Sequence, residues 1–185
     1  MSVPSILKQH RATSIFFAAS VLVCLSIAVW YLWMYPYGNT HHACISNLGL
    51  ALMNYAEQNG GFFPAGGTCP EASLSLLYYA GDNPGAGNLG GKTVREKVAQ
   101  KALDTVGSLG PESCDWHYVE GLTVKDDHRL ALLWDKVGLG HFGQRLLGGG
   151  HEVLFVNNDH YIVTGENWPK FLDEQRELLA NLKRK

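Results

Sequence analysis

The side chains best suited to chemistry in this sequence belong to its four cysteines and eight histidines. No Cys-x-x-Cys pair and no His-x-x-x-His pair occurs, although these are common spacings of zinc ligands. His151 and His160 nevertheless flank a predicted pair of strands, and His141 lies on the glycine-rich segment before them. A three-histidine metal site is therefore an alternative chemistry for this chain. The simpler interpretation makes His160 a turn residue that hydrogen-bonds its own loop.

Cys44, Cys69 and Cys114 lie in the part of the chain that we assign below to the outside of the cytoplasm, where disulfides persist. Cys69 and Cys114 are expected in loops on either side of a predicted helix over residues 93–107. A bridge between them would close a loop of about 45 residues and contribute roughly 3–4 kcal/mol in the chain-entropy model. Sequence does not determine connectivity. Cys69–Cys114 is the candidate disulfide that we favour, with Cys44 on a helix that faces the domain.

Asp126, Asp127 and Asp135 are carboxylates of the kind that bind calcium. Their spacing matches no calcium-binding loop, so we interpret Asp126 and Asp127 as solvated turn residues. Ser73 and Ser75 lack the Gly-x-Ser-x-Gly context of a hydrolase nucleophile. The sequence therefore assigns no catalytic residue and no metal ligand.

A glycine-rich segment over residues 85–91 is followed by Lys92 and Thr93, as in a phosphate-binding loop. The phosphate-binding pattern also requires glycine at position 86, where this chain has Ala86. We therefore predict a flexible loop that leads into a capped helix, and we assign no cofactor.

One apolar run dominates the N-terminal region. No Asp, Glu, Lys or Arg occurs over residues 12–41, and about 20 helical residues suffice to cross a bilayer core. Lys8 and Arg11 precede the run, whereas the first lysine or arginine after it is Lys92. The positive-inside rule then predicts a cytoplasmic tail over residues 1–11, a transmembrane helix over residues 12–35 and an extracytoplasmic domain over residues 36–185. The protein would lie in the inner (plasma) membrane, with the lipid bilayer as its first partner.

Aromatic side chains cluster at the far end of the run, where amphipathic rings favour a membrane interface: Trp30, Tyr31, Trp33, Tyr35 and Tyr37. A cleaved signal peptide is the alternative, but its apolar region would be shorter and would end in small residues. Cys24, within the run, is interpreted as a packing residue. The net charge of −2 and the pI near 6.4 give no basic surface, so we expect no nucleic-acid partner.

The remaining sequence predicts an α+β domain. Apolar residues at helical spacing predict an amphipathic stalk helix over residues 42–59, which either continues the transmembrane helix or stacks above it. Residues 73–79 are helix or strand, and Thr93 with Glu96 forms a capping box for the helix over residues 93–107. The helices and strands should pack as a small antiparallel sheet with flanking helices. Four strands and a last helix complete the prediction: residues 116–119, 130–134, 151–156 and 160–164, then residue 167 to the end.

Several segments of this domain resemble bacterial type IV pilin-like proteins, and above all the major pseudopilin of type II secretion and the pilin-like proteins of planctomycete-type bacteria. Residues 44–64 read CISNLGLALMNYAEQNGGFFP and resemble the segment just beyond the membrane in that family. Residues 116–123, WHYVEGLT, and 132–136, LLWDK, are similar to two of its strands. Residues 153–161, VLFVNNDHY, are similar to its hairpin, with Asn158-Asp159 in place of Asp-Gly.

This resemblance implies a pilin-like head and a structural or assembly role, not an enzyme. A small ligand-binding head on the anchor is the alternative. Partners would be further copies of the chain, other pseudopilins or secretion-platform proteins, and the loops at 61–67 and 138–150 are candidate contact regions. The anchor departs from the family, because the apolar run carries no glutamate and no prepilin cleavage site precedes it. An intramembrane carboxylate would need a partner such as a neighbouring N-terminal amine. The resemblance therefore covers the extracytoplasmic domain and not the anchor.

Overall fold

A computed structural model of the chain describes residues 3–37, 43–81 and 84–182, with side chains from Phe16 onward. The chain divides into two compact units, Met1–Pro36 and Tyr37–Lys185. The predicted boundary after residue 35 lies next to this division.

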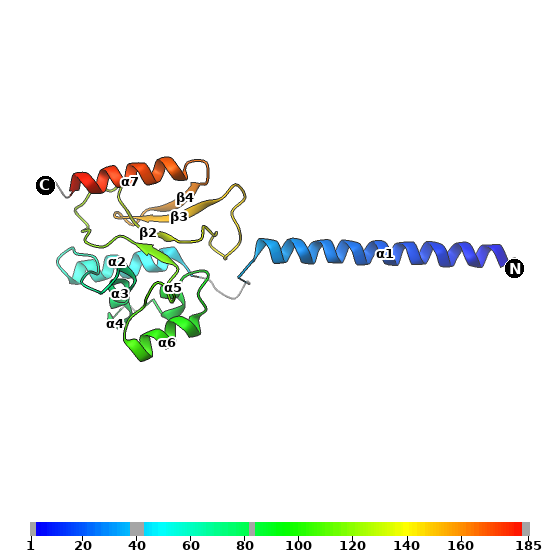
Figure 1. Cartoon of the computed structure of the whole chain (residues 1–185), viewed down its shortest axis with the longest axis horizontal. Coiled ribbons are helices and arrows are strands. Elements are labelled where there is room, and N and C mark those ends of the chain that lie inside the picture. The colour runs from blue at the N-terminus through cyan, green and yellow to red at the C-terminus, as the bar shows by residue number, and fades with distance from the viewer. Residues whose placement is uncertain (1–2, 38–42, 82–83, 183–185) are drawn as a thin grey trace. The chain divides into compact units, whose positions relative to one another are not determined.

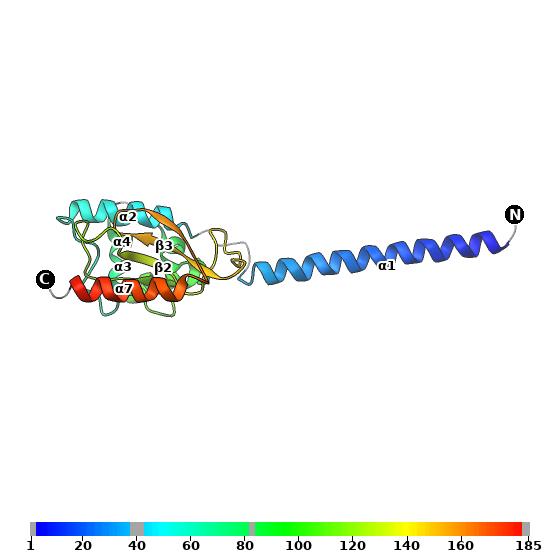
Figure 2. The ribbon, with the colours of Figure 1, turned by 90° about the horizontal axis from the view of Figure 1, so that it is seen from above.

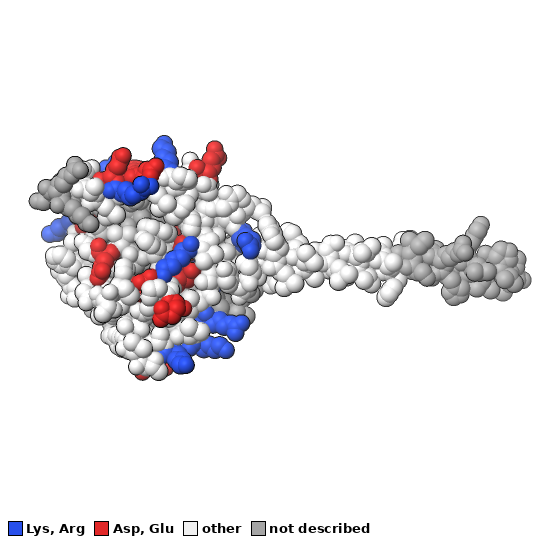
Figure 3. All heavy atoms as spheres, in the orientation of Figure 1, with Lys and Arg blue, Asp and Glu red and all other residues white. Residues whose placement is uncertain are grey.

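The first unit is a single helix, α1 (Val3–Met34) (Figure 1). Its segment Phe16–Met34 has a mean hydropathy of 2.1 and buries none of its residues, and by length and composition it is able to cross a membrane, as a signal sequence also is. Figure 3 shows its described part free of charged side chains. The hydroxyls of Ser20 and Ser26 donate to the carbonyls of Phe16 and Leu22, four residues earlier, so they need no partner outside the helix.

α1 does not continue into the next helix, contrary to the continuous stalk that was one of our two expectations. It ends at Met34, and Tyr35 to Tyr37 are not helical. Pro36 explains this end, because proline has no amide hydrogen to donate and disfavours helical backbone at the preceding residue. Residues 38–42, which include the start of the predicted stalk, lie outside the described residues.

The predicted amphipathic helix is confirmed as α2 (Ile45–Gln58), but it belongs to the core of the second unit. Ile45, Leu48 and Leu52 on its inner face are completely buried, whereas Leu50 on its outer face is exposed. Gly49 allows a close approach to the sheet, since a Cβ atom there would lie 2.2 Å from Asn158 Oδ1 and 3.0 Å from Leu154 Cδ1.

The four predicted strands form one antiparallel sheet in the order β1-β2-β3-β4. They are β1 (Trp116–Tyr118), β2 (Ala131–Asp135), β3 (Gly150–Phe155) and β4 (His160–Thr164). β3 and β4 form the predicted hairpin around residues 157–159, where Asn158 has a left-handed backbone with φ of 68°. Asparagine tolerates this conformation better than most residues, so the turn forms here without a glycine.

Helices cover both faces of the sheet, as Figures 1 and 2 show. α7 (Trp168–Leu182) lies on one face, where Phe171 packs with Trp134 and Phe155. α2 and the short helices lie on the other face and share a second apolar cluster with it. Because both faces are covered, every residue of β2 is buried, unlike the alternating pattern of a half-exposed strand.

Three short helices and one longer helix connect α2 to β1. They are α3 (Pro70–Leu74), α4 (Leu76–Tyr79), α5 (Ala86–Gly90) and α6 (Glu96–Val106). The short apolar segment predicted as helix or strand is therefore helical, and α5 occupies a stretch predicted to be a flexible loop. The capping box is wrong: α6 begins at Glu96 after Arg95, with no side-chain cap. The Thr93 side chain instead hydrogen-bonds Asp115.

Candidate functional site

The strand register aligns three large side chains on the face of the sheet that α2 covers. Trp116 of β1 pairs with Asp135 of β2, and the pairing of Trp134 with Val153 places Asp135 beside Glu152 of β3. Side chains alternate along a strand, so Trp134 points toward α7 and Asp135 points the other way. At this end of the strands, the Trp116 ring and the carboxylates of Asp135 and Glu152 therefore face the layer formed by α2 and the short helices.

Lys92 reaches this row from the connection between α5 and α6. The preceding residue, Gly91, has a left-handed backbone with φ of 89°, and a Cβ atom there would lie 2.7 Å from the Cβ of Asp115. Both features require glycine, since L side chains rarely adopt that φ and no space exists for one. The Asp115 amide also donates to the Gly90 carbonyl at 2.7 Å. This close backbone contact directs the side chain of Lys92 toward the carboxylates of Asp135 and Glu152.

The Lys92 ammonium uses all three of its hydrogen-bond donors. Its Nζ lies 3.1 Å from Asp135 Oδ2, 2.8 Å from Glu152 Oε2 and 2.7 Å from the Leu139 carbonyl oxygen. The Trp116 ring centroid is 5.6 Å from Nζ, within range of a cation–π contact. The side chains of Lys92 and Asp135 are 0% exposed and that of Glu152 is 9% exposed. Lys92, Asp135 and Glu152 are called the lysine cluster below.

The Asp135 carboxylate accepts hydrogen bonds at both oxygens. Oδ2 accepts from the Leu139 amide at 2.7 Å as well as from Lys92, and Oδ1 lies 3.2 Å from His151 Nδ1. His151 Nδ1 is also 2.7 Å from the Asp135 carbonyl oxygen. Because a carbonyl oxygen can only accept, Nδ1 carries the ring proton. His151 stacks on Trp168 at 3.9 Å between ring centroids, which fixes the ring beside the carboxylate.

Asp115 lies next to the lysine cluster and is itself buried, at 4% exposure. Its Oδ2 has no hydrogen-bond partner, and among the described residues it is the one buried side-chain nitrogen or oxygen in that state. Burial raises the pKa of Asp115 to about 6, helped by the negative charge of Asp135 and opposed by a hydrogen bond from Thr93.

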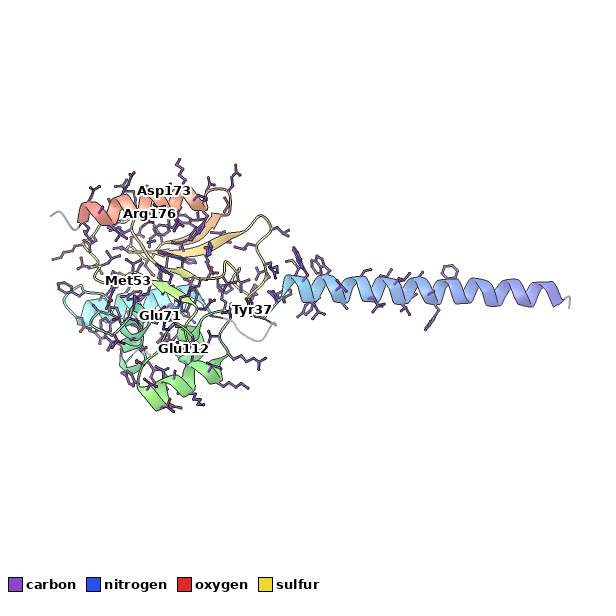
Figure 4. All side chains as sticks on the ribbon, viewed as in Figure 1. Tyr37, Met53, Glu71, Glu112, Asp173 and Arg176 are labelled. Carbon is purple, nitrogen blue, oxygen red and sulfur yellow. The ribbon has the colours of Figure 1, made fainter. Side chains whose placement is uncertain are left out.

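A second ion pair ties the helical layer to the sheet. Lys136 Nζ lies 2.6 Å from Glu71 Oε1 of α3, which Figure 4 labels, and 2.9 Å from the Cys114 carbonyl oxygen. Burial alone would raise the pKa of Glu71, but the hydrogen bond and charge of Lys136 outweigh it and lower that pKa. The exposed pair Asp173–Arg176, by contrast, lies on the outer side of α7 (Figure 4).

Little of the lysine cluster is accessible to a dissolved substrate, because the side chains of Lys92 and Asp135 are fully buried and that of Glu152 is 9% exposed. A groove of about 400 Å³ lies elsewhere, beside α7 and the β3–β4 turn. Arg129, Tyr161 and Glu174 are among its lining residues, and no member of the lysine cluster lines it. Any reaction at the lysine cluster would therefore take place among its own side chains.

The alternative three-histidine metal site is not formed among the described residues. His151 pairs with Val163 and His160 pairs with Leu154, so the two histidines lie at opposite ends of the hairpin, roughly 10 Å apart along the strands. His160 Nε2 instead lies 3.1 Å from Ser46 Oγ on α2, so its partner is not its own loop. The described residues contain no cluster of three histidine, cysteine or acidic side chains placed to hold a metal ion.

The candidate disulfide Cys69–Cys114 is not formed in this structure, where all four cysteines are free thiols. Cys114 is buried and its thiol donates to the Leu89 carbonyl oxygen at 3.2 Å, whereas Cys69 is half-exposed and lies 4.0 Å from the Leu109 carbonyl oxygen. The two sulfurs therefore point to different carbonyls. Cys44 precedes α2 and is buried, as expected of a residue that faces the domain.

The three aspartates have separate environments. Asp126 accepts hydrogen bonds from the backbone amide and the hydroxyl of Thr123, and Asp127 pairs with Arg129, so both are turn residues as interpreted. The Arg129 guanidinium holds the pKa of Asp127 far below its usual range. Asp135 alone is buried, in the lysine cluster.

Sequence reasoning missed Lys92 and Glu152 as partners. Lys92 falls at the end of an incomplete phosphate-binding pattern, and Glu152 lies within a β-rich run. One signal is present in the sequence: Glu152 is an acidic residue directly before the apolar run over residues 153–156, and its burial there is unfavourable unless a cation faces it. The identity of that cation depends on contacts between distant segments.

No protein-family model, curated protein or solved structure matches this chain.

Proposed function

We propose that this protein is a membrane-anchored structural or assembly protein of the pseudopilin type, whose extracytoplasmic α+β domain acts through surface contacts and not through catalysis. The observation that carries this proposal is α1, whose segment Phe16–Met34 has a mean hydropathy of 2.1, contains no charged residue and is not buried within the chain. A helix of this kind is stable when a bilayer, or other such helices, surrounds it. Residues 1–11 would face the cytoplasm.

The second unit supports the pseudopilin part of the proposal by its arrangement. The segment 44–64 supplies α2, whose apolar face packs on the sheet, and the segments that resemble pilin strands supply β1, β2 and the β3–β4 hairpin. A helix packed on an antiparallel sheet in this order is what the resemblance implies for a pilin-like head.

The candidate contact regions carry exposed apolar side chains. Phe62 lies in the loop after α2, and Phe142 and Leu147 lie in the loop between β2 and β3. All three have more than half of their surface exposed, at 62%, 57% and 80%. Exposed large apolar side chains of this kind are available for contacts with partner proteins. The expected partners are further copies of the chain, other pseudopilins or secretion-platform proteins.

Photo-crosslinking in membranes tests this function. A photoreactive amino acid replaces Phe142 or Leu147 in the tagged full-length chain, and mass spectrometry identifies what it captures. We expect a ladder of crosslinked copies or capture of secretion-platform proteins, with much less from the same amino acid at Arg176 on the outer side of α7. A monomer at every position, together with a stoichiometric bound metal or a ligand-induced rise in melting temperature, would overturn the proposal.

A further inference from the structure

The lysine cluster brings together the three groups that amide formation between side chains requires. An amine is the nucleophile, a carboxyl carbon is the electrophile, and a second carboxylate carries protons between them. Lys92 Nζ is 3.1 Å from Asp135 Oδ2 and 2.8 Å from Glu152 Oε2, and the fold holds all three groups in place. Fixed proximity of this kind replaces a collision between separate molecules.

We propose that Lys92 and Asp135 become joined by an isopeptide bond, formed inside the folded domain with Glu152 as the proton carrier. This modification is independent of the pseudopilin role, because it depends only on contacts within the second unit. It would make the lysine cluster a self-modifying site and not merely a buried ion pair.

The hydrogen bonds of Asp135 identify it as the carboxyl that reacts. The Leu139 amide donates to its Oδ2 at 2.7 Å, and His151 Nδ1–H lies 3.2 Å from its Oδ1. His151 Nδ1–H, beside Oδ1, would stabilise the oxyanion that forms there when the amine attacks, and the Leu139 amide holds Oδ2, the oxygen that leaves as water. Glu152 accepts from Lys92, and no such pair of donors holds it among the described residues. Asp135 is thus activated, and Glu152 is left to carry protons.

Burial favours the condensation over its reversal. Lys92 and Asp135 are 0% exposed, and the buried Trp116 ring lies 5.6 Å from Nζ. Buried ammonium and carboxylate groups carry a large desolvation cost that their mutual attraction offsets only in part. An amide is neutral and water is released from the site, so the product removes one positive and one negative buried charge and leaves the Glu152 carboxylate, whose side chain is 9% exposed, as the remaining charge.

The step balances without any added reagent. The Lys92 ammonium passes one proton through Glu152 to the Asp135 carboxylate, which gives a neutral amine and a neutral carboxylic acid. The amine then attacks the Asp135 Cγ and a C–N bond forms. Glu152 takes a second proton from the nitrogen and gives it to the departing hydroxyl, the C–O bond breaks and water leaves. The nitrogen keeps one hydrogen, and Glu152 ends as the carboxylate that it was.

The bond would connect the two layers of the domain. Lys92 precedes α6 in the helical layer and Asp135 ends β2 in the sheet, with a separation of 43 positions in sequence. A covalent bond there would hold the short helices on the sheet even when the surrounding packing loosens.

Peptide mass spectrometry of the full-length chain, purified in detergent, tests the inference. We expect a peptide containing Lys92 linked to one containing Asp135, with the sum of their masses reduced by one water. Lys92→Arg and Asp135→Ala should abolish the linked species. Glu152→Gln keeps the shape of the side chain, and we expect it to form the link about 100-fold more slowly.

The wild-type protein alone decides the outcome, so a variant that fails to fold does not weaken the test. Near-ultraviolet circular dichroism establishes which variants are folded before their linked fractions are compared. Complete recovery of unlinked Lys92 from folded wild-type protein would overturn the inference and leave an ordinary ion pair. A link from Lys92 to Glu152 would overturn the assignment of Asp135.

Discussion

Removing Lys92 leaves the carboxylates of Asp135 and Glu152 buried without a cation, whether or not the amide has formed. An unpaired buried charge is costly, so we expect Lys92→Met to lower the free energy of unfolding by about 3–5 kcal/mol. Denaturant unfolding of the full-length chain in detergent measures this loss. Arg129→Met is the matched control, because its pair with Asp127 is exposed and should leave stability unchanged.

A second substitution sharpens this prediction. Adding Glu152→Gln to Lys92→Met removes one of the two stranded charges, so the double variant should recover part of the lost stability. A single variant as stable as the wild type would show that the lysine cluster contributes nothing to the fold.

Asp115 predicts a specific pH dependence. Its pKa in the folded domain is about 6, above the ordinary value of 3.8, so the folded protein binds this proton more tightly than the unfolded chain does. The stabilisation from the bound proton is present at low pH and is lost as pH rises through 6. In the Asp115→Asn variant the side chain at this position carries no titrating proton, and all other ionisable groups are the same as in the wild type.

The free energy of unfolding of Asp115→Asn, minus that of the wild type, should therefore increase as pH rises from about 4 to 6 and then level off. The increase is at most about 3 kcal/mol. Unfolding curves for both proteins across this pH range measure it. Burial lowers the pKa of His117, so this group changes stability with pH in the opposite direction to Asp115. His117 is present in both proteins, so its contribution cancels in the difference. A difference that stays constant with pH would contradict the environment described for Asp115.

At the scale of elements, α2 offers a direct comparison of its two faces. Leu52 is 0% exposed against the sheet, and Leu50, two residues earlier, is 57% exposed. Leu52→Ala should lower the free energy of unfolding by about 2–5 kcal/mol through lost burial and the cavity it leaves. Leu50→Ala should change it by well under about 1 kcal/mol. Equal losses in thermal or denaturant unfolding would mean that α2 does not pack on the sheet by this face.

Sequence periodicity predicted the elements that carry a clear local signal. α2, α6, α7, all four strands and the hairpin turn fall within a few residues of the expected ranges. The failures are at places where a distant contact decides the outcome. Thr93 bonds Asp115 and does not cap α6, and α5 forms in a glycine-rich stretch where Leu89 and Ala86 enter the core.

The site was far less predictable than the elements. Local pattern describes residues along one segment, whereas the lysine cluster joins a loop, the end of β2 and the start of β3. The histidine hypothesis failed for the complementary reason: His151 and His160 are near in sequence, but an antiparallel hairpin places them at opposite ends. The strand register decides both results, since it brings Asp135 beside Glu152 and keeps His151 away from His160. Register is not visible in the sequence of a single strand.

At the scale of the whole molecule, the apolar α1 and the charged surface of the second unit suit different solvents (Figure 3). We expect the chain to stay in the membrane fraction after alkaline washing, with a mass that includes α1, because an apolar helix of this length partitions into lipid. A chain that begins at Gly38 should be released into the soluble fraction. A full-length product that lacks the N-terminal segment would show that α1 is a cleaved signal sequence.

Orientation requires a separate measurement. In a Cys69→Ser background, a membrane-impermeant maleimide should label Leu147→Cys without disrupting the cytoplasmic membrane, and should label Lys8→Cys only after that membrane is opened. This result follows from Lys8 and Arg11 remaining in the cytoplasm. The reverse pattern of labelling would invert the proposed topology.

The burial of Cys114 has a practical consequence for studying this domain in place. Its thiol is 1% exposed, and burial raises its pKa to about 12, so almost no reactive thiolate exists while the domain is closed. Labelling of this one sulfur must await an opening of the surrounding structure, and its rate then measures how often the domain opens. The measurement needs no denaturant and works in an intact membrane. The rate of Cys114 labelling therefore reports how often the domain opens. That rate should fall if a partner or a covalent link holds the domain shut.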